Sequence, residues 1–305
     1  MKKFIFISII SFIIFPLGAE GAILYLEPAG GNYYQGDTFI VETRIDTEGE
    51  CINAIEGNLS FSQDTLEIVD FSKGNSILTI WLKEPAFDQN SGKVFFAGGI
   101  PGGYCGTLSG DSGRSNLLSK IVFKVKENSR GRQARVDLLD SSQALLNDGL
   151  GTAAKLEFQG ANFSILSGVP ESPKKEWEEA IEKDKIPPEA FEMEARQDPS
   201  VFEGKYFLIF STTDKQTGVD YYEVREGKRD WRRAESPYLL EDQSLTSIIR
   251  VRAVDKAGNV IIAEHPALEK PFPYWVVALI ILIILGYWLY KRTKNKWREK
   301  EHRQS

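Results

Sequence analysis

The feature that most constrains this chain is an uncharged stretch near its C-terminus, which runs from Pro273 to Tyr290 and is followed by a basic tail. Its eighteen residues would rise about 27 Å as a helix, close to the roughly 30 Å hydrocarbon thickness of a bilayer. Aromatic rings mark both ends of the stretch, as is typical at water–lipid interfaces. The sequence therefore predicts one transmembrane helix over 273–290. A buried core helix is the alternative interpretation.

The tail after Tyr290 predicts the orientation. Seven Lys or Arg side chains face only two Glu there, and basic flanks stay on the cytoplasmic side of a membrane. We expect a single-pass type I protein of the plasma membrane, with its N-terminal domains extracellular and a short basic cytoplasmic tail over 291–305.

The N-terminus has the layout of a secretory signal. Lys2 and Lys3 precede an apolar stretch, which is followed by small residues. We expect a signal peptide over 1–21, with cleavage after Ala19 or after Gly21; an uncleaved anchor is the alternative.

The charge of the exported part is more negative than the −6 of the whole chain. Without the two leader lysines and the seven tail cations, 28 of the 37 basic residues remain. Without one leader glutamate and two tail glutamates, 40 of the 43 acidic residues remain, so the net charge is near −12. This charge argues against a nucleic-acid partner, because phosphates bind basic surfaces. It is compatible with a neutral or basic partner.

The chain has two cysteines, Cys51 and Cys105. Outside the cell we expect them to form a disulfide, although two separate buried thiols are the alternative.

Residues 22–167 contain the signals of an antiparallel β-sandwich. The stretch Thr38–Asp46 alternates apolar and polar residues from Phe39 onward, as a half-buried strand does. Similar runs recur along the segment, separated by Gly, Asn and Asp turn signals.

Two further regions precede the apolar stretch. Residues 168–188 combine prolines with many charges, which predicts a linker with a short helix around Trp177–Ile181. Residues 189–266 are again rich in strands and resemble small bacterial immunoglobulin-like or fibronectin-like modules, in which a strand often ends in the pattern found at Val254–Asn259. We expect this unit to act as a spacer.

Residues for catalysis are scarce. His265 lies beside the expected membrane helix and His302 lies in the tail, so extracellular Ser-His-Asp or Cys-His catalysis is not expected. A glycosidase that uses carboxylates such as Glu56 is the weakest alternative. We therefore expect no enzyme, no catalytic residue and no cofactor.

No metal site is expected either. The turns at Asn147–Gly149 and Asp111–Gly113 offer oxygen ligands, but neither forms a complete calcium-binding loop.

Aromatic side chains in or near loops are the candidate binding residues. Tyr33, Trp81 and Tyr104 stand beside turn or glycine-rich segments, where rings can stack on sugars or anchor a protein. For Trp81 a core role is the alternative, and for Tyr104 both interpretations are open.

Several stretches of the first region together resemble a cohesin module. They are Gly36–Val41, Ile52–Val69, Leu117–Val125 and Leu146–Gly149. The resemblance implies an all-β, jelly-roll sandwich that binds a dockerin-like protein module and shares its fold with some carbohydrate-binding modules. Ala54 and Glu56 stand where dockerin-binding cohesins often carry Asn and Asp.

The expected function is that of a membrane-anchored cell-surface binding or adhesion protein, in which a cohesin-like domain docks an extracellular protein. The alternative is carbohydrate recognition, in which the same sandwich binds a polysaccharide through exposed aromatic residues.

Overall fold

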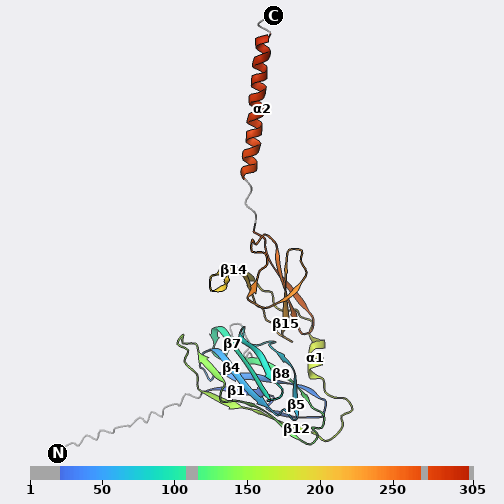
Figure 1. The fold of residues 1–305 in the computed structure, drawn as a ribbon. Coiled ribbons are helices and arrows are strands. Elements are labelled where there is room, and N and C mark those ends of the chain that lie inside the picture. Colours follow the sequence, from blue (N-terminus) through green and yellow to red (C-terminus); the bar gives the residue numbers. More distant parts are fainter. Residues whose placement is uncertain (1–20, 108–115, 269–273, 302–305) are drawn as a thin grey trace, which may run out of the picture.

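A computed structural model of the protein describes residues 21–107, 116–268 and 274–301. The expected signal peptide up to residue 20 and the Asp111–Gly113 turn lie outside the described residues. Within them the chain consists mostly of β-strands, with two helices (Figure 1). The all-β fold class predicted from the sequence is confirmed.

The first unit is a sandwich of two sheets, each named here after one of its strands. The β3 sheet contains, in spatial order, β11 (Leu156–Gln159), β1 (Ala22–Glu27), β3 (Thr38–Asp46), β8 (Leu117–Val125) and β5 (Leu66–Ser72). The β4 sheet contains, in spatial order, β2 (Gly30–Tyr33), β12 (Ala161–Ile165), β9 (Gln133–Leu138), β4 (Ile52–Phe61), β7 (Lys93–Tyr104) and β6 (Ile80–Asp88), with β10 (Gln143–Leu146) paired to β4.

The core of the sandwich lies between these sheets and comes from alternate residues of each strand. In β3, Phe39, Val41 and Ile45 are fully buried, and Phe39 pairs across the ladder with the buried Phe123 of β8. Because strand side chains point to opposite faces in turn, one set fills the core while the other faces outward. The alternation in the sequence therefore corresponds to the buried inner face of β3.

A disulfide joins Cys51, just before β4, to Cys105, just after β7. These strands are antiparallel neighbours, and the pairing of Ile52 with Tyr104 brings the two cysteines together. The bond thus closes one end of the β4–β7 ladder.

The second unit is a smaller pair of sheets. The β14 sheet contains β13 (Met193–Asp198), β14 (Val201–Phe210) and β17 (Tyr238–Leu239). The β15 sheet contains β16 (Arg232–Ala234), β15 (Val219–Glu226), β18 (Ile249–Asp255) and β19 (Val260–His265). Their shared core includes Leu208, Phe210, Val224 and Val251.

The segment between the units packs against the first sandwich. It contains α1 (Glu176–Lys183), where the short helix was expected, and α1 contacts β3. Trp177 is buried, and its indole N–H donates a hydrogen bond of 3.0 Å to Asp70 of β5. The Lys256 ammonium of the second unit lies 2.7 Å from the same carboxylate. One aspartate thus holds both the connecting segment and the second unit.

The two units also meet backbone to backbone. The side-chain hydroxyl of Ser72 donates a 2.6 Å hydrogen bond to the carbonyl of Thr217, and the backbone amide of Asn75 donates to the carbonyl of Asp214 at 2.9 Å. A Cβ on Gly74 would lie 2.8 Å from the backbone nitrogen of Gly218. Only glycine permits this approach. The contact between 72–75 and 214–218 is called the junction below.

The helix α2 (Tyr274–Glu301) stands clear of both β units (Figure 1). Its stretch Tyr274–Arg292 has a mean hydropathy of 1.9 and is not buried against the rest of the protein. Among the described helices, α2 alone is long and apolar enough to cross a membrane. The helix continues past Tyr290 into the segment expected to form the tail.

We expect the double variant Cys51→Ala, Cys105→Ala to lose about 4 kcal/mol of unfolding free energy, because the disulfide closes a loop with a sequence separation of 54 residues in the unfolded chain. Urea unfolding with and without reductant measures this. Reductant should not change the urea midpoint of the double variant. If reductant also leaves the urea midpoint of the wild type unchanged, the disulfide does not stabilise the fold as expected.

We expect Gly74→Ala to open the junction, at a cost of about 1–3 kcal/mol for the clash with the opposing backbone. Faster trypsin cleavage after Lys183 and Lys185 would report the opening. The matched control is Gly99→Ala, whose Cβ would meet its nearest neighbour at an ordinary 3.7 Å. Equal cleavage rates for the two variants would show that the junction does not depend on this contact.

Candidate binding surface

Tyr33, the first sequence candidate, belongs to the core of the sandwich. It is 7% exposed and stacks on Phe39 with ring centroids 4.0 Å apart. Burial raises the pKa of its hydroxyl to about 12, and the nearby carboxylates of Glu176 and Asp37 add to the rise. The Lys174 ammonium lies 5.0 Å from the ring centroid. The ring is therefore enclosed in this structure.

Tyr104, at the end of β7, is also enclosed. It is 2% exposed, and its hydroxyl donates a 2.8 Å hydrogen bond to the carbonyl of Gly106. Its neighbour Cys105 is tied to Cys51. These contacts fix the glycine-rich loop that was expected to display the ring.

Trp81 of β6 is half-buried. Its indole packs against Phe71 and Phe96, with centroid distances of 6.3 and 6.1 Å. The Lys73 ammonium lies 5.0 Å from the ring centroid. Sugar stacking by Tyr33, Trp81 or Tyr104 thus stays a prediction, and for the two tyrosines it requires the ring to leave the core.

Strand β6 also exposes large apolar side chains, which were not among the candidate residues predicted from the sequence. Ile80 is 51% exposed, Leu82 68% and Phe87 46%. A strand that exposes three large apolar residues is unusual for a soluble surface, and such patches often contact another molecule. These three residues are together called the β6 surface below. The ladder pairs Ile80 with Gly99 and Phe87 with the core residue Val94, so Ile80 and Phe87 lie toward opposite faces of β6.

The outer face of the β4 sheet continues this surface. Lys83 of β6 and Glu56 of β4 both pair with Ala97 of β7, so the three residues share one face. The Lys83 ammonium lies 3.8 Å from the Glu56 carboxylate and 5.2 Å from the ring centroid of Phe95. The face beside the apolar residues therefore carries both charge signs close together.

The backbone edge of β6 is poorly suited to receive another strand. β6 is the last strand of its sheet, and its pairing with β7 is irregular between Trp81 and Lys83 and again between Lys83 and Ala86. Pro85 lacks an N–H, and Glu84 adds a charge. Bulges, proline and charges are the features that keep sheet edges from pairing. A partner would therefore contact side chains rather than extend the sheet.

The outer face of the β3 sheet is already occupied. The Glu178 carboxylate of α1 accepts a 2.8 Å hydrogen bond from Thr38, and Lys120 of β8 donates to the carbonyl of Gln216 in the second unit at 3.0 Å. Burial lowers the pKa of Lys120, while the Glu42 and Asp214 carboxylates oppose that shift. Among the described residues, α1 and the second unit thus contact the β3 sheet at Thr38 and Lys120.

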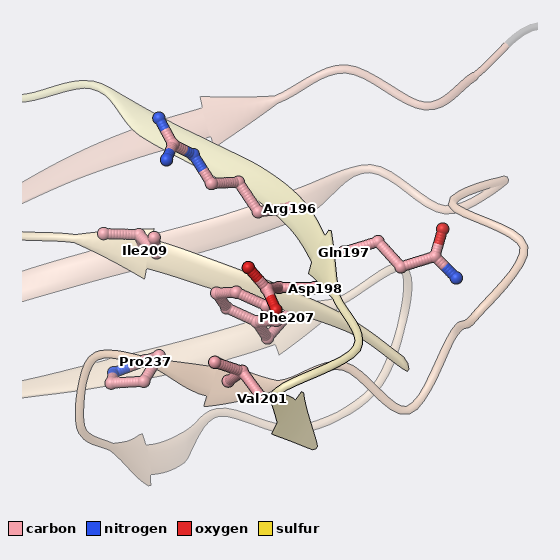
Figure 2. A pocket seen from close by; sticks show the side chains of 7 residues that line it. All are labelled: Arg196, Gln197, Asp198, Val201, Phe207, Ile209 and Pro237. Atoms are coloured by element: carbon pink, nitrogen blue, oxygen red, sulfur yellow. The ribbon is translucent and has the colours of Figure 1, made fainter. Parts of the chain in front are cut away.

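The second unit has a hollow of its own. A pocket of about 440 Å³ opens on the β14 sheet, lined among others by Arg196, Val201 and Phe207 (Figure 2). Asp198 and Pro237 also border it. The lining combines four apolar residues with Arg196, Gln197 and Asp198.

No family model and no curated protein matches the chain. Among solved structures it is similar to a non-cellulosomal cohesin from the archaeon Archaeoglobus fulgidus, at 17% identity and a TM-score of 0.38, over 48% of this chain and 93% of that one. It is also similar to the seventh ScaB type I cohesin of Pseudobacteroides cellulosolvens, at 19% identity and a TM-score of 0.37, over 51% and 98%.

A third similarity is to the cohesin module of a family 33 glycoside hydrolase from Clostridium perfringens, at 12% identity and a TM-score of 0.36, over 48% of this chain and 96% of that one. Each of these similarities to a cohesin module covers about half of this chain.

A core role for Tyr33 predicts a specific response to pH. The pKa of the Tyr33 hydroxyl is 10.0 in the unfolded chain and about 12 in the fold. Below pH 10 the hydroxyl is neutral in both states, and its contribution to the free energy of unfolding is fully present. This contribution is lost as the pH rises from 10 through about 12. We expect Tyr33→Phe to lose less thermal stability than the wild type between pH 9 and pH 11. Equal losses of thermal stability in the wild type and in Tyr33→Phe would contradict a core role for Tyr33.

Proposed function

We propose that this protein is a membrane-anchored surface protein whose first sandwich binds an extracellular protein partner through the β6 surface. The observation that carries the proposal is the exposure of Ile80, Leu82 and Phe87 on a strand whose edge is blocked against pairing. Apolar side chains near the centre of an interface supply much of its binding energy.

The anchor in this proposal is α2. The apolar stretch of α2 and the cations that follow it support a type I orientation, in which both β units lie outside and the tail is cytoplasmic. In this arrangement the proposed domains 22–167 and 189–266 form the head and the stalk.

The chemistry of the partner follows from the charge. The exported part carries a net charge near −12, while the neighbourhood of the β6 surface contains Lys73, Lys83, Glu56 and Glu84. A partner that is neutral or basic overall and presents apolar anchors of its own fits such a surface. A dockerin-like module is the partner class implied by the sequence resemblance, and it is therefore the first probe to use. If the partner lies on another cell, the protein would act in cell adhesion.

We expect Leu82→Glu to weaken binding of the partner by about tenfold or more, because it places a charge in a desolvated contact. The full chain in lipid nanodiscs is used to capture secreted and surface proteins, and each retained protein is then purified and titrated by calorimetry. The matched control is Leu150→Glu, an equally drastic change at a leucine that is 85% exposed after β10.

A partner that binds the wild type and Leu150→Glu alike but not Leu82→Glu supports the proposal. Retained proteins that bind all three forms equally would place the contact elsewhere. Binding of polysaccharide alone, on a glycan array run in parallel, would favour carbohydrate recognition instead.

A further inference from the structure

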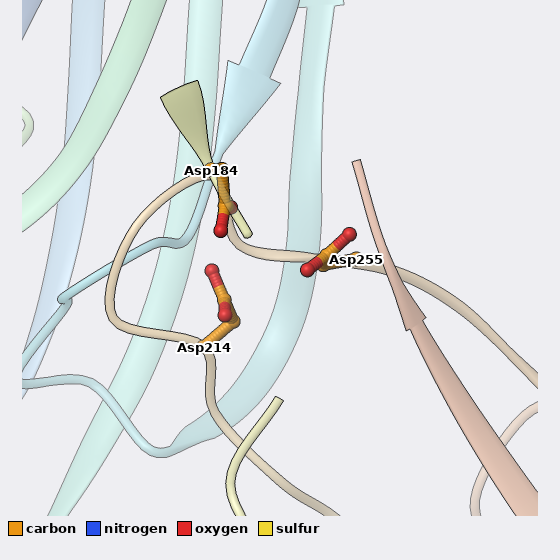
Figure 3. Close-up of side chains that lie close together, drawn as sticks. All are labelled: Asp184, Asp214 and Asp255. Carbon is orange, nitrogen blue, oxygen red and sulfur yellow. The ribbon is translucent and has the colours of Figure 1, made fainter. Parts of the chain in front are cut away.

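Three buried aspartates meet beside the junction. Asp184 follows α1, Asp214 lies between β14 and β15, and Asp255 ends β18. They are between 1% and 2% exposed, and one carboxylate oxygen from each lies within 4.8 Å of the others. The carboxylates converge on one point (Figure 3).

Two of the carboxylates are held by hydrogen-bond donors, and the side-chain amide of Asn259 reaches both of them, at 2.8 Å from Asp255 and 3.5 Å from Asp184. Asp184 accepts bonds from the amide of Ile186 at 3.0 Å, and from the amide and hydroxyl of Thr217 at 3.2 and 2.6 Å. Asp255 accepts two bonds of 2.8 Å from the amide and side chain of Asn259. These donors fix the orientation of both groups before any ligand arrives.

Asp214 is different, because half of its carboxylate has no partner. Its Oδ1 accepts hydrogen bonds from the amides of Gln216 and Gly218, at 2.9 and 2.7 Å, whereas its Oδ2 is buried without any hydrogen bond. The carboxylate is directed toward that of Asp184 in Figure 3. A buried carboxylate oxygen with no donor costs free energy unless something positive faces it.

The cluster has no ion pair to balance its charge. Across the described ranges, no Lys, Arg or His forms a salt bridge with any of the three aspartates. Burial raises the pKa of Asp214, and the nearby carboxylates of Asp184 and Asp255 raise it further, while the two backbone hydrogen bonds oppose the change. The three buried carboxylates therefore repel one another, and Lys120, on whose pKa Asp214 and Asp184 act, forms no salt bridge with them among the described residues.

We propose that Asp184, Asp214 and Asp255 form a Ca²⁺-binding site that fixes the second unit against the first. All ligands are hard oxygens, and Ca²⁺ accepts such ligands at about 2.3–2.6 Å, so opposite oxygens in its shell lie about 4.6–5.2 Å apart. The three atoms lie within 4.8 Å of one another, so all of them can belong to one such shell. Mg²⁺ draws its ligands closer and keeps several waters, which suits a buried all-carboxylate cluster less well.

The position of the site gives the ion a structural role. Asp184 belongs to the connecting segment, and the backbone carbonyl of Asp214 accepts the junction bond from Asn75. Thr217, which donates to Asp184, offers its own carbonyl to Ser72. A bound Ca²⁺ would therefore hold the connecting segment and the 214–218 loop in the conformation that contacts the first unit.

The direct test is titration of the full chain in detergent micelles with CaCl₂, after removal of divalent ions with EDTA. Calorimetry should show about one ion per chain that binds more tightly than Mg²⁺, and saturation should raise the thermal midpoint by about 5 °C. No heat and no shift up to about 10 mM Ca²⁺, beyond the Kd range of weak extracellular sites, would overturn the proposal.

Asp214→Asn is the diagnostic variant. We expect it to weaken Ca²⁺ binding by at least about tenfold, because a charged ligand is lost. In EDTA it should be as stable as the wild type or more so, since one of three repelling charges is gone. The matched control is Asp148→Asn in an exposed turn, which should bind Ca²⁺ as the wild type does. Equal affinity of Asp214→Asn and the wild type would place any bound ion elsewhere.

Proteolysis of the wild type keeps the proposal testable even if Asp214→Asn fails to fold. Ca²⁺ should slow trypsin cleavage after Lys183 and Lys185, which flank Asp184. If Ca²⁺ leaves the cleavage rate unchanged, the metal site is rejected.

Discussion

The arrangement of the whole molecule depends on the junction, where the backbones of 72–75 and 214–218 touch. Backbone contact this close needs glycine on both sides, and Gly74 and Gly218 supply it. Because Asp70 also binds both Trp177 and Lys256, the connecting segment and the second unit are held at the same edge of the sandwich. The first unit therefore has a defined orientation relative to the second unit.

This orientation determines which residues of the first unit are covered by the second unit and which are exposed. α1 contacts β3, and Lys120 of β8 donates a hydrogen bond to Gln216 of the second unit, whereas Ile80, Leu82 and Phe87 of β6 are exposed. The segment expected to be a charged linker with a short helix also packs against the first unit, because its Trp177 side chain is buried.

Strands and the apolar helix could be predicted because each depends on a local pattern. The alternation at Thr38–Asp46 gave the inner face of β3, and the length of the apolar stretch gave α2. The exposure of Leu82 could not be predicted in this way, since it depends on β6 lying at the end of its sheet. The aspartate cluster was missed because its members lie 30 and 41 positions apart in the sequence and only the fold unites them.

The β6 surface and the proposed Ca²⁺ site are connected through the entropy that the protein loses when a partner binds. A head that swings on a free tether loses orientational freedom at each encounter, and that loss subtracts from affinity. The junction removes part of this freedom beforehand, and Ca²⁺ at Asp184, Asp214 and Asp255 would remove more by balancing charges that otherwise repel. Loss of the ion should therefore weaken binding at the β6 surface without altering any residue that touches the partner.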